Sequence, residues 1–288
     1  MRYGFIEGHR AMWPLRPMCR MLAVSKSGYF AWRDGRESPR RSRDRALTVQ
    51  IAVIHQESRQ TYGSPRVFKE LKARGIALGR KRVERLMKSA GIAVHPLRRF
   101  VTTTDSDHDQ PIAPNLLEQD FTAAAPNQRW VTDITYIPTD EGWLFLAAIM
   151  DLYSRRIVGW AMQPTMHRSL VLKALDMAVT DRRPSPGLVH HSDRGSQYAS
   201  EDYRHALDAH GLVASMSRRA CCYDNAAMES FWHTLKNELT HRQHYQTRAE
   251  AQQNIFEYIE VFYNRVRRHS SIGYLSPVTF ELLRPKAA

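Results

Sequence analysis

The sequence predicts an α/β protein in which a mixed β-sheet is flanked by helices and preceded by an all-helical region. Between residues 130 and 162, three β-rich runs follow one another, and from residue 168 to 215 helical periods alternate with short apolar runs. This order is typical of a mixed sheet with helices on its faces. Residues 61–92 instead carry apolar residues at helical spacing on both sides of a short turn, which is a helix-turn-helix pattern.

The composition favours a polyanionic partner. The chain has 288 residues, 43% of them hydrophobic, and a net charge of +13, with a pI near 9.9. Its length suffices for two or three domains with a sizeable core, and its charge favours nucleic acid. A basic enzyme without a nucleic-acid role is the alternative. No run of 18 apolar residues and no signal-peptide core is present, so we expect a cytoplasmic protein without a membrane segment.

The three cysteines do not suggest a disulfide framework or a zinc site. Cys221 and Cys222 are adjacent, Cys19 is far from both, and His190 and His191 are also adjacent. Structural zinc sites use paired ligands separated by a few residues. We therefore expect a reducing compartment and no zinc.

Residues 1–45 are expected to form a helical and basic segment. Within it, residues 24–32 suggest a short helix with aromatic side chains available for packing, and residues 36–45 read as a basic hinge containing serine and proline. We find no chemistry in this segment.

Residues 46–100 are expected to form a helix-turn-helix DNA-binding region. A first helix begins near Leu47, a second is capped by Ser64 with Pro65 at its first position, and a third runs over residues 80–90. Residues 65–100 hold eleven basic and two acidic side chains. A helical hairpin with a solvated basic face is the alternative. The residues of the third helix that we expect to contact DNA are Arg80, Lys81, Arg82, Arg85 and Lys88.

A linker over residues 101–127 leads to a core over residues 128–240. The expected strands of this core are 130–138, 143–151, 155–162, 188–191 and 212–215, and its first helices are 168–179 and 201–210. Residues 241–288 form a C-terminal helical and basic segment. In this segment Arg265, Arg267 and Arg268 suit contact with a DNA backbone, and packing against the core is the alternative.

Three carboxylates, Asp133, Asp193 and Glu229, lie in local sequence that is otherwise β-rich or apolar. Polar residues in such segments are informative, whereas an acid elsewhere is usually a solvated surface group. Two divalent ions about 3.5–4 Å apart can hold the attacking and leaving oxygens of a phosphodiester in line. Mg²⁺ binds through oxygen ligands that include one or two carboxylates. The three acids therefore suit a metal-dependent reaction at phosphate.

The helical period around Glu229 places a lysine beside it. At about 100° per residue, Glu229 and Lys236 project about 20° apart, with His233 next to them. Lys236 could therefore hold a DNA phosphate or base while Glu229 binds metal. The apolar stripe of this helix consists of Met228, Trp232, Leu235 and Leu239.

Two further acids are expected to be structural. Asp151 ends an apolar strand, where we expect it to cap the turn and pair with Arg155 or Arg156; a fourth catalytic acid is the alternative. Asp224 and its neighbour Asn225 both suit the start of the Glu229 helix.

The turn that carries Asp193 holds several polar neighbours. Gly195 is expected to serve backbone geometry near a bound phosphate, and Arg194 is expected to contact DNA, with a solvated turn as the alternative. His191 is expected to be packed or hydrogen-bonded, with a proton carrier as the alternative.

Three motifs carry a family resemblance: Trp130-Val-Thr-Asp-Ile-Thr-Tyr136, His191-Ser-Asp-Arg-Gly-Ser-Gln-Tyr198 and Cys221-Cys-Tyr-Asp-Asn-Ala-Ala-Met-Glu-Ser-Phe-Trp232. They resemble the catalytic motifs of the DDE transposases with an integrase-type core. The match is closest to the OrfB proteins of the IS-three group of bacterial insertion sequences. The 35 residues between the last two acids, and the lysine seven residues after the glutamate, fit that group. The resemblance covers roughly residues 15–285.

The resemblance implies a ribonuclease H-like core with Asp133 on its first strand, Asp193 just after its fourth and Glu229 on a later helix. It implies a transposase that uses two Mg²⁺ ions, or Mn²⁺, to cut and join DNA strands, with a circular intermediate. A ribonuclease H-like nuclease or resolvase that cuts without joining is the first alternative. A DNA-binding regulator with an inactive core is the second.

The resemblance also implies partners: double-stranded DNA at the element ends and target, a homo-oligomer on DNA, and an upstream-frame OrfA protein or fusion. The expected location is the bacterial nucleoid. The sequence shows no sustained heptad pattern of its own.

Overall fold

The structure is a computed structural model that describes residues 1–35, 37–94, 111–218 and 222–284. The chain divides into two compact units, Met1–Val94 and His95–Ala288. Residues 95–110, which include the first part of the expected linker, lie outside the described ranges. None of the helices in these ranges combines the length and the hydropathy of a membrane-spanning segment.

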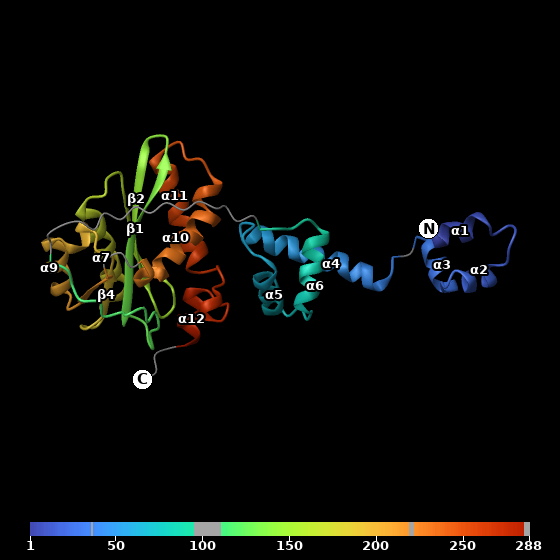
Figure 1. The fold of residues 1–288 in the computed structure, drawn as a ribbon, viewed down its shortest axis with the longest axis horizontal. Helices are drawn as coiled ribbons and strands as arrows, with labels where there is room; N and C mark the ends of the chain where they lie inside the picture. Colours follow the sequence, from blue (N-terminus) through green and yellow to red (C-terminus); the bar gives the residue numbers. More distant parts are fainter. Residues whose placement is uncertain (36, 95–110, 219–221, 285–288) are drawn as a thin grey trace. The chain divides into compact units, whose positions relative to one another are not determined.

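The first unit begins with three short helices (Figure 1), α1 (Arg2–Gly8), α2 (Leu15–Met21) and α3 (Lys26–Arg33). The expected helix over residues 24–32 corresponds to α3, whereas α1 and α2 were not predicted. Helices of seven residues are too short to display an apolar period. The core that these helices share consists of Ile6, Met18, Cys19 and Tyr29.

The longest helix of this unit, α4 (Pro39–Glu57), corrects the predicted hinge over residues 36–45. Ser38 caps the helix by accepting the backbone N–H of Arg41 at 3.2 Å, and Pro39 occupies its first turn. A serine–proline pair starts a helix as readily as it forms a hinge, and here the cap decides the outcome.

Helices α5 (Ser64–Ala73) and α6 (Arg80–Ser89) confirm the predicted helix pair within a residue or two at their ends. Gly63, not Ser64, is the residue that precedes α5, so the predicted serine cap is wrong. The three helices α4, α5 and α6 contact one another. Their buried side chains include Ile51, Ile54, Val67, Leu71, Val83, Leu86 and Met87.

The second unit is built on a five-stranded mixed sheet in the order β3-β2-β1-β4-β5. Strands β1 to β3 are antiparallel neighbours, and β4 and β5 continue the sheet in parallel with β1. The ribonuclease H-like mixed sheet predicted from the sequence is confirmed, with every strand within two residues of its expected bounds. The strands are β1 (Arg129–Thr139), β2 (Gly142–Asp151), β3 (Ile157–Gln163), β4 (Val189–Ser192) and β5 (Val213–Met216).

Helices cover both faces of this sheet (Figure 1). Thr132 approaches Tyr198 of α8 (Ser196–Ala199) at 3.1 Å, while the next residue, Asp133, is bonded by Trp232 of α10 (Ala226–Glu238). Because successive strand residues point to opposite faces, α8 and α10 belong to different layers. The layer of α8 also contains α7 (Arg168–Arg182) and α9 (Glu201–Ala209), which share one apolar core with β1 and β2.

The C-terminal segment bonds to the edge strand β3 of the sheet at Ile157. It contains α11 (Arg248–Glu257), a π-helix (Tyr258–Tyr263) and α12 (Pro277–Leu283). The Asn264 side chain accepts the backbone N–H of Ile157 at 3.0 Å and donates to its carbonyl at 2.9 Å. These two bonds satisfy backbone groups of the edge strand β3 that would otherwise be open to another strand.

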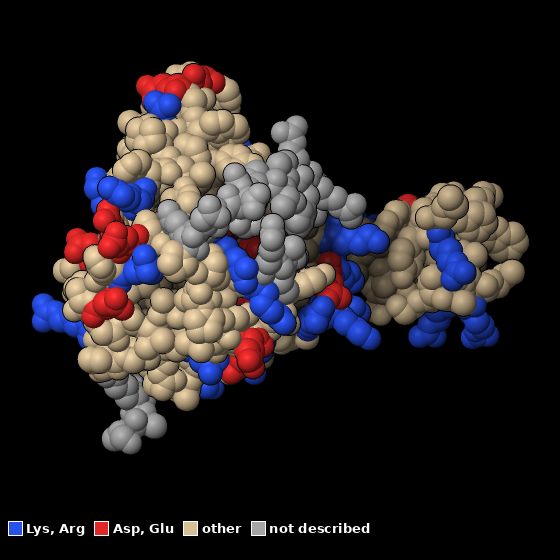
Figure 2. Space-filling view, turned by 60° about the vertical axis from the view of Figure 1, so that its left-hand side comes forward, with Lys and Arg blue, Asp and Glu red and all other residues tan. Residues whose placement is uncertain are grey.

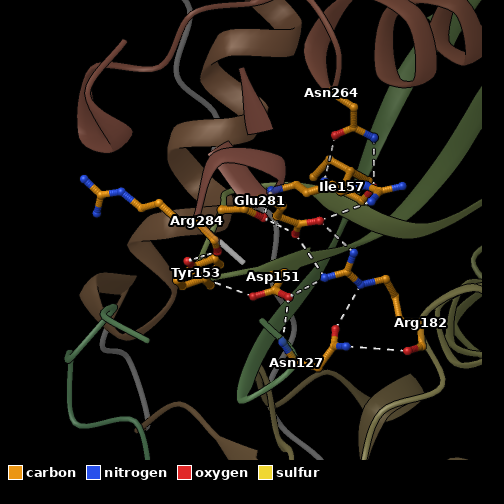
Figure 3. Close-up of polar contacts among 10 residues, drawn as sticks. Asn127, Asp151, Tyr153, Ile157, Arg182, Asn264, Glu281 and Arg284 are labelled. Atoms are coloured by element: carbon orange, nitrogen blue, oxygen red, sulfur yellow. Dashed lines mark hydrogen bonds and ion pairs between the residues drawn. The ribbon is translucent and has the colours of Figure 1, made fainter. Parts of the chain in front are cut away.

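A buried ion network joins the end of β2 to α7 and α12 (Figure 3). Asp151 is fully buried and accepts the backbone N–H groups of Asn127 at 2.8 Å and Tyr153 at 3.0 Å. Its ion-pair partner is Arg182, at 3.2 Å, so the predicted turn cap is confirmed and the predicted pairing with Arg155 or Arg156 is wrong. Arg182 also binds Glu281 at 2.9 and 3.0 Å.

We expect Arg182→Met to destabilise the protein by about 3–5 kcal/mol, because it leaves Asp151 and Glu281 without their shared cation in a buried site. The measurement is urea unfolding of the full chain. Arg183→Met, at the adjacent exposed position, is the matched control and should change the free energy of unfolding by less than about 0.5 kcal/mol. Equal effects of the two substitutions would contradict this account of the network.

Candidate active site

The three predicted acids come from three different elements of the second unit. Asp133 lies in the middle of β1, Asp193 directly follows β4, and Glu229 lies in the first turn of α10. Strands β1 and β4 are parallel neighbours, with Trp130 opposite His190. The sheet therefore brings the first two acids to adjacent strands, while the third depends on the placement of a helix.

The environment of Asp133 strongly perturbs its pKa. Its Oδ1 accepts the backbone N–H of Ile134 at 2.8 Å, and its Oδ2 accepts the indole N–H of Trp232 at 2.9 Å. Burial and the negative charges of Asp193 and Glu229 raise the pKa of Asp133 to about 8, although both hydrogen bonds act in the opposite direction. The charges of both other acids therefore affect the pKa of Asp133.

The Asp193 turn shows a different role for Gly195 from the predicted one. Gly195 has φ of −60°, which any residue can adopt, so the turn does not need a glycine for backbone geometry. Its backbone N–H donates to Asp193 Oδ1 at 2.9 Å, and a Cβ atom built on it would stand 3.1 Å from that same oxygen. The glycine therefore leaves room for the carboxylate.

Glu229 has an exposed side chain, yet partial desolvation raises its pKa. The predicted apolar stripe of its helix is confirmed, because Met228, Trp232, Leu235 and Leu239 are all buried. Burial of the stripe orients α10 so that Glu229 lies on its flank.

The donor set fits a hard divalent cation. It consists of three carboxylates, Asp133 and Asp193 partly exposed and Glu229 exposed, and the proximity of like charge raises the pKa of Asp133. A cation placed among such groups would relieve that repulsion, and oxygen donors suit Mg²⁺ or Mn²⁺. As they stand, no three acidic, histidine or cysteine side chains in the described ranges form a cluster at metal-ligand spacing.

Lys236 lies on the same side of α10, two turns after Glu229. Its ammonium nitrogen stands 5.3 Å from the centre of the Tyr136 ring, which is within the range of a cation–π contact. Burial lowers the pKa of Lys236, and the nearby charge of Asp133 acts in the opposite direction. The lysine therefore lies near Asp133. His233, which the helical period also places near Glu229, forms a hydrogen bond with the Asn237 side chain at 2.8 Å.

His191 is a packed histidine. Its Nδ1 lies 2.8 Å from Ser215 Oγ and its Nε2 lies 3.2 Å from Ser217 Oγ. Burial lowers the pKa of His191 to about 4, so the ring is neutral near pH 7. The structural interpretation of this residue agrees with its surroundings, and the proton-carrier alternative does not.

Neither residue expected at the start of α10 caps it with a side-chain bond. Asn225 donates its side-chain N–H to the carbonyl of Thr132 at 3.1 Å. Asp224 is fully buried and binds Arg218, at 2.8 Å between Oδ1 and Nη2, together with the side-chain amides of Asn115 and Gln119, each at 3.0 Å. These contacts tie the loop before α10 to segments far away in the sequence.

The predicted DNA-binding arginines of the C-terminal segment divide into two groups. Arg267 is only 4% exposed and forms a two-bond ion pair with Glu238, at 2.7 Å each. Its prediction as a DNA contact is therefore wrong, because both ends of its guanidinium are committed inside the protein. Arg265 is exposed, and Arg268 donates to the Tyr274 carbonyl at 2.8 Å.

The remaining predicted DNA contacts differ in how they are already engaged. Arg194 donates to the Ser217 carbonyl at 2.6 Å. On α6, Arg82 and Arg85 both bind Asp44 of α4 at 2.7 Å, which lowers the pKa of Asp44.

The other three cations of α6 differ from one another. Arg80 forms an ion pair with Glu84 at 2.9 Å on the helix surface. Lys81 and Lys88 are exposed and form no ion pair with any described residue.

Two contacts to β1 were missed by sequence reasoning: the indole N–H of Trp232 on Asp133, and the amide of Asn225 on Thr132. Trp232 was assigned only to the apolar stripe, and its polar atom gives no sequence signal. Asn225 was read only as a cap.

Comparison with known proteins gives concordant matches. Models described as "Integrase core domain" match residues 123–222 and 229–283, and one described as "HTH-like domain" matches residues 42–100. The chain is 50% identical over 263 residues to "Insertion element IS600 uncharacterized 31 kDa protein" of Shigella sonnei, covering 91% of this chain and 97% of that protein. It is 44% identical over 283 residues to "Transposase InsF for insertion sequence IS3A" of Escherichia coli strain K12, covering 98% of each.

Among solved structures, the simian T-cell lymphotropic virus intasome in complex with the PP2A regulatory subunit B56 gamma is similar to 83% of this chain and 76% of its own matched chain. The TM-score is 0.49 at 14% identity.

Asp133→Asn should stabilise the metal-free protein by about 1–3 kcal/mol at pH 8.5. The folded-state pKa of about 8 lies above the ordinary value of 3.8, so the stabilising contribution of the protonated group is complete below pH 3.8 and is lost as the pH rises through 8. Asparagine cannot ionise, so the variant avoids that loss of stability. Thermal unfolding of both proteins in EDTA between pH 5 and 9 measures the difference in stability.

The matched control for this prediction is Asp176→Asn, at an exposed position of α7. The stability difference between wild type and Asp133→Asn should widen towards pH 8, whereas that of the control should stay flat. A flat difference for Asp133→Asn would contradict the raised pKa.

Proposed function

This chain belongs to the IS3 family of DDE transposases, and from that premise we propose that Asp133, Asp193 and Glu229 are the acids at which it cuts and joins DNA. They would hold two Mg²⁺ ions, with Mn²⁺ as the alternative ion. The observation that carries the proposal is the action of two negative charges on the third: Asp193 and Glu229 both raise the pKa of Asp133. Three acids from separate elements share one electrostatic environment.

The metal pair, when bound, supplies charge neutralisation at the transferring phosphoryl group and alignment of the attacking and leaving oxygens. The chain's own part is to present the ligands and the DNA. Burial of the Met228 side of α10 leaves Glu229 on the flank of the helix, and Gly195 leaves space for the Asp193 carboxylate. The nearby charge of Asp133 acts on Lys236, which supports the proposal that this lysine binds a DNA phosphate or base near the reacting bond.

Two successive displacements at phosphorus account for transposition. In the first, the oxygen of water bonds to phosphorus at the element end and the bond to the 3′ oxygen breaks, which releases a 3′-hydroxyl. In the second, that hydroxyl bonds to phosphorus of another strand and displaces its 3′ oxygen. Both steps exchange one phosphorus–oxygen bond for another, so neither requires a covalent link to the protein.

Element ends and target DNA are the proposed nucleic-acid partners, in the bacterial nucleoid, with a homo-oligomer of this chain bringing two ends together. An upstream-frame OrfA protein or fusion is the proposed protein partner. In the view of Figure 2, lysine and arginine side chains are spread over the surface rather than gathered in one patch. The charge on this face therefore does not mark a path for DNA, and individual cations have to be tested.

Lys81 and Lys88 are the cations of α6 that we expect to bind phosphate, because the arginines of this helix are engaged with Asp44 and Glu84. Lys81→Gln and Lys88→Gln, each alone, should lower the slope of log affinity against log salt by about 0.9. The measurement is fluorescence anisotropy with element-end DNA at several salt concentrations.

Lys173→Gln, at an exposed position of α7 in the other unit, is the matched control and should leave the slope unchanged. If Lys81→Gln and Lys88→Gln also leave it unchanged, α6 does not contact the DNA backbone through these residues.

Cleavage and joining of labelled element-end DNA in Mg²⁺ tests the proposed function, with Glu229→Gln as the variant. Removing a residue that only hydrogen-bonds a metal ligand lowers metal affinity or activity by about 10–100-fold. Glu229→Gln removes a proposed ligand itself, so it should lower the rates of cleavage and joining by at least about 10²-fold while DNA binding persists. Glu201→Gln, exposed on α9, is the matched control and should retain activity. Cleavage without joining by wild type would favour the nuclease, and equal activity of wild type and Glu229→Gln would overturn the assignment.

A further inference from the structure

Trp232 combines two properties that an apolar stripe residue does not need. Its side chain is only 6% exposed, packed with Phe231 at 4.8 Å between ring centres. Its one polar atom, Nε1, donates to Oδ2 of Asp133 at 2.9 Å. A buried indole requires an acceptor for its N–H, and here the acceptor is the carboxylate of one of the three proposed ligands.

This bond fixes the orientation of the Asp133 carboxylate. Oδ1 already receives the backbone N–H of Ile134 at 2.8 Å, so each oxygen holds one donor and the plane of the group is set from two sides. A carboxylate oxygen accepts more than one interaction, so both oxygens keep capacity for a cation. The packed ring cannot turn away without disturbing the stripe.

The chemistry of the donor suits a metal ligand. A lysine or arginine in the same place would neutralise the carboxylate and compete with a metal ion for it. An indole N–H is a neutral donor, so it orients the carboxylate without adding a positive charge that would compete with a metal ion. Hydrogen bonds of this kind to a ligand tune metal affinity.

The position of Trp232 on α10 links two of the acids. Glu229 lies three residues before Trp232 and four residues after Asn225, whose side chain donates to the Thr132 carbonyl at 3.1 Å. The helix is therefore fastened to β1 at Thr132 and at Asp133, and the proposed glutamate ligand lies between the two fastening points. Any shift of α10 along β1 would stretch one of these bonds.

We propose that Trp232 is a positioning residue of the metal site: its indole N–H holds the Asp133 carboxylate in the orientation that a divalent ion requires. The inference rests on the proposed function in taking Asp133 and Glu229 as metal ligands. It predicts that loss of one N–H group, with the ring kept, weakens metal binding.

Trp232→Phe tests this, and Trp160→Phe is a matched control. Trp160 likewise donates its indole N–H to a carboxylate, Glu260 Oε1, at 2.8 Å, but on β3 at the edge of the sheet. The full-length protein is titrated with MgCl₂, without DNA, and thermal unfolding reports the stabilisation by bound metal. Trp232→Phe should raise the half-saturating Mg²⁺ concentration by about 10–100-fold, and Trp160→Phe should leave it within about two-fold of wild type.

A second readout separates positioning from simple loss of structure. With cleavage of element-end DNA, Trp232→Phe should require more Mg²⁺ for half-maximal rate but approach the wild-type rate at saturating Mg²⁺. A lower rate at all Mg²⁺ concentrations with unchanged half-saturation would overturn the inference, as would a half-saturating concentration within two-fold of wild type. The Mg²⁺ titration needs no DNA, so a protein that shows the predicted metal shift but never cuts or joins DNA would contradict the proposed function alone.

If Trp232→Phe does not fold, the wild-type protein supplies the test. The chain has six tryptophans, and the indole N–H signal of Trp232 in a nitrogen–proton NMR spectrum can be assigned by exclusion, with phenylalanine substitutions at the other five. On addition of Mg²⁺ this signal should move while that of Trp160 stays in place. An unmoved Trp232 signal at a Mg²⁺ concentration that stabilises the protein would overturn the inference.

Discussion

The negative charges of Asp193 and Glu229 act on a third, desolvated carboxylate, Asp133, and this is the constraint on which the proposed site depends. Asp133 is desolvated and senses both Asp193 and Glu229, and each of these effects raises its pKa. Repulsion between carboxylates in a poorly solvated site has to be offset by the rest of the fold. The sheet fixes where two of the acids lie: Asp133 is on β1, and Asp193 directly follows the parallel neighbour β4, whose register with β1 is set by backbone hydrogen bonds.

The third acid has no such register, since it lies on a helix, and side chains hold that helix at both ends. At its start, buried Asp224 binds Arg218, Asn115 and Gln119. At its end, Glu238 receives two bonds from Arg267 and one from the Tyr258 hydroxyl at 2.9 Å. The C-terminal segment therefore supports the helix of the proposed active site, and part of its basic and aromatic character is explained by packing.

Sequence reasoning predicted those features that a local pattern encodes. The strands of the core have clear β-rich runs, and the stripe from Met228 to Leu239 follows the helical period, so both were placed within two residues or assigned to the correct face. The pattern of Ser38 and Pro39 was ambiguous between a hinge and a helix start, and only the observed capping bond resolves it. The short helices α1 and α2 span too few residues to show a period.

Partnerships between distant residues could not be predicted in the same way. Asp151 had two arginines close in sequence, but its partner is Arg182, because α7 passes the end of β2 in the folded chain. Arg267 resembled a surface cation until its burial against Glu238 was known. The contact of Trp232 could not be predicted for the same reason. The apolar stripe predicts that its ring is buried, but the acceptor of its N–H depends on how α10 packs against β1.

The central claim is that Asp133, Asp193 and Glu229 share bound metal. Anomalous scattering from Mn²⁺ in crystals of the full chain with element-end DNA tests it most directly. The account predicts two peaks about 3.5–4 Å apart, bounded by the carboxylates of these three residues. Peaks elsewhere, or none between Asp133 and Glu229 in crystals that hold both DNA and Mn²⁺, would contradict it.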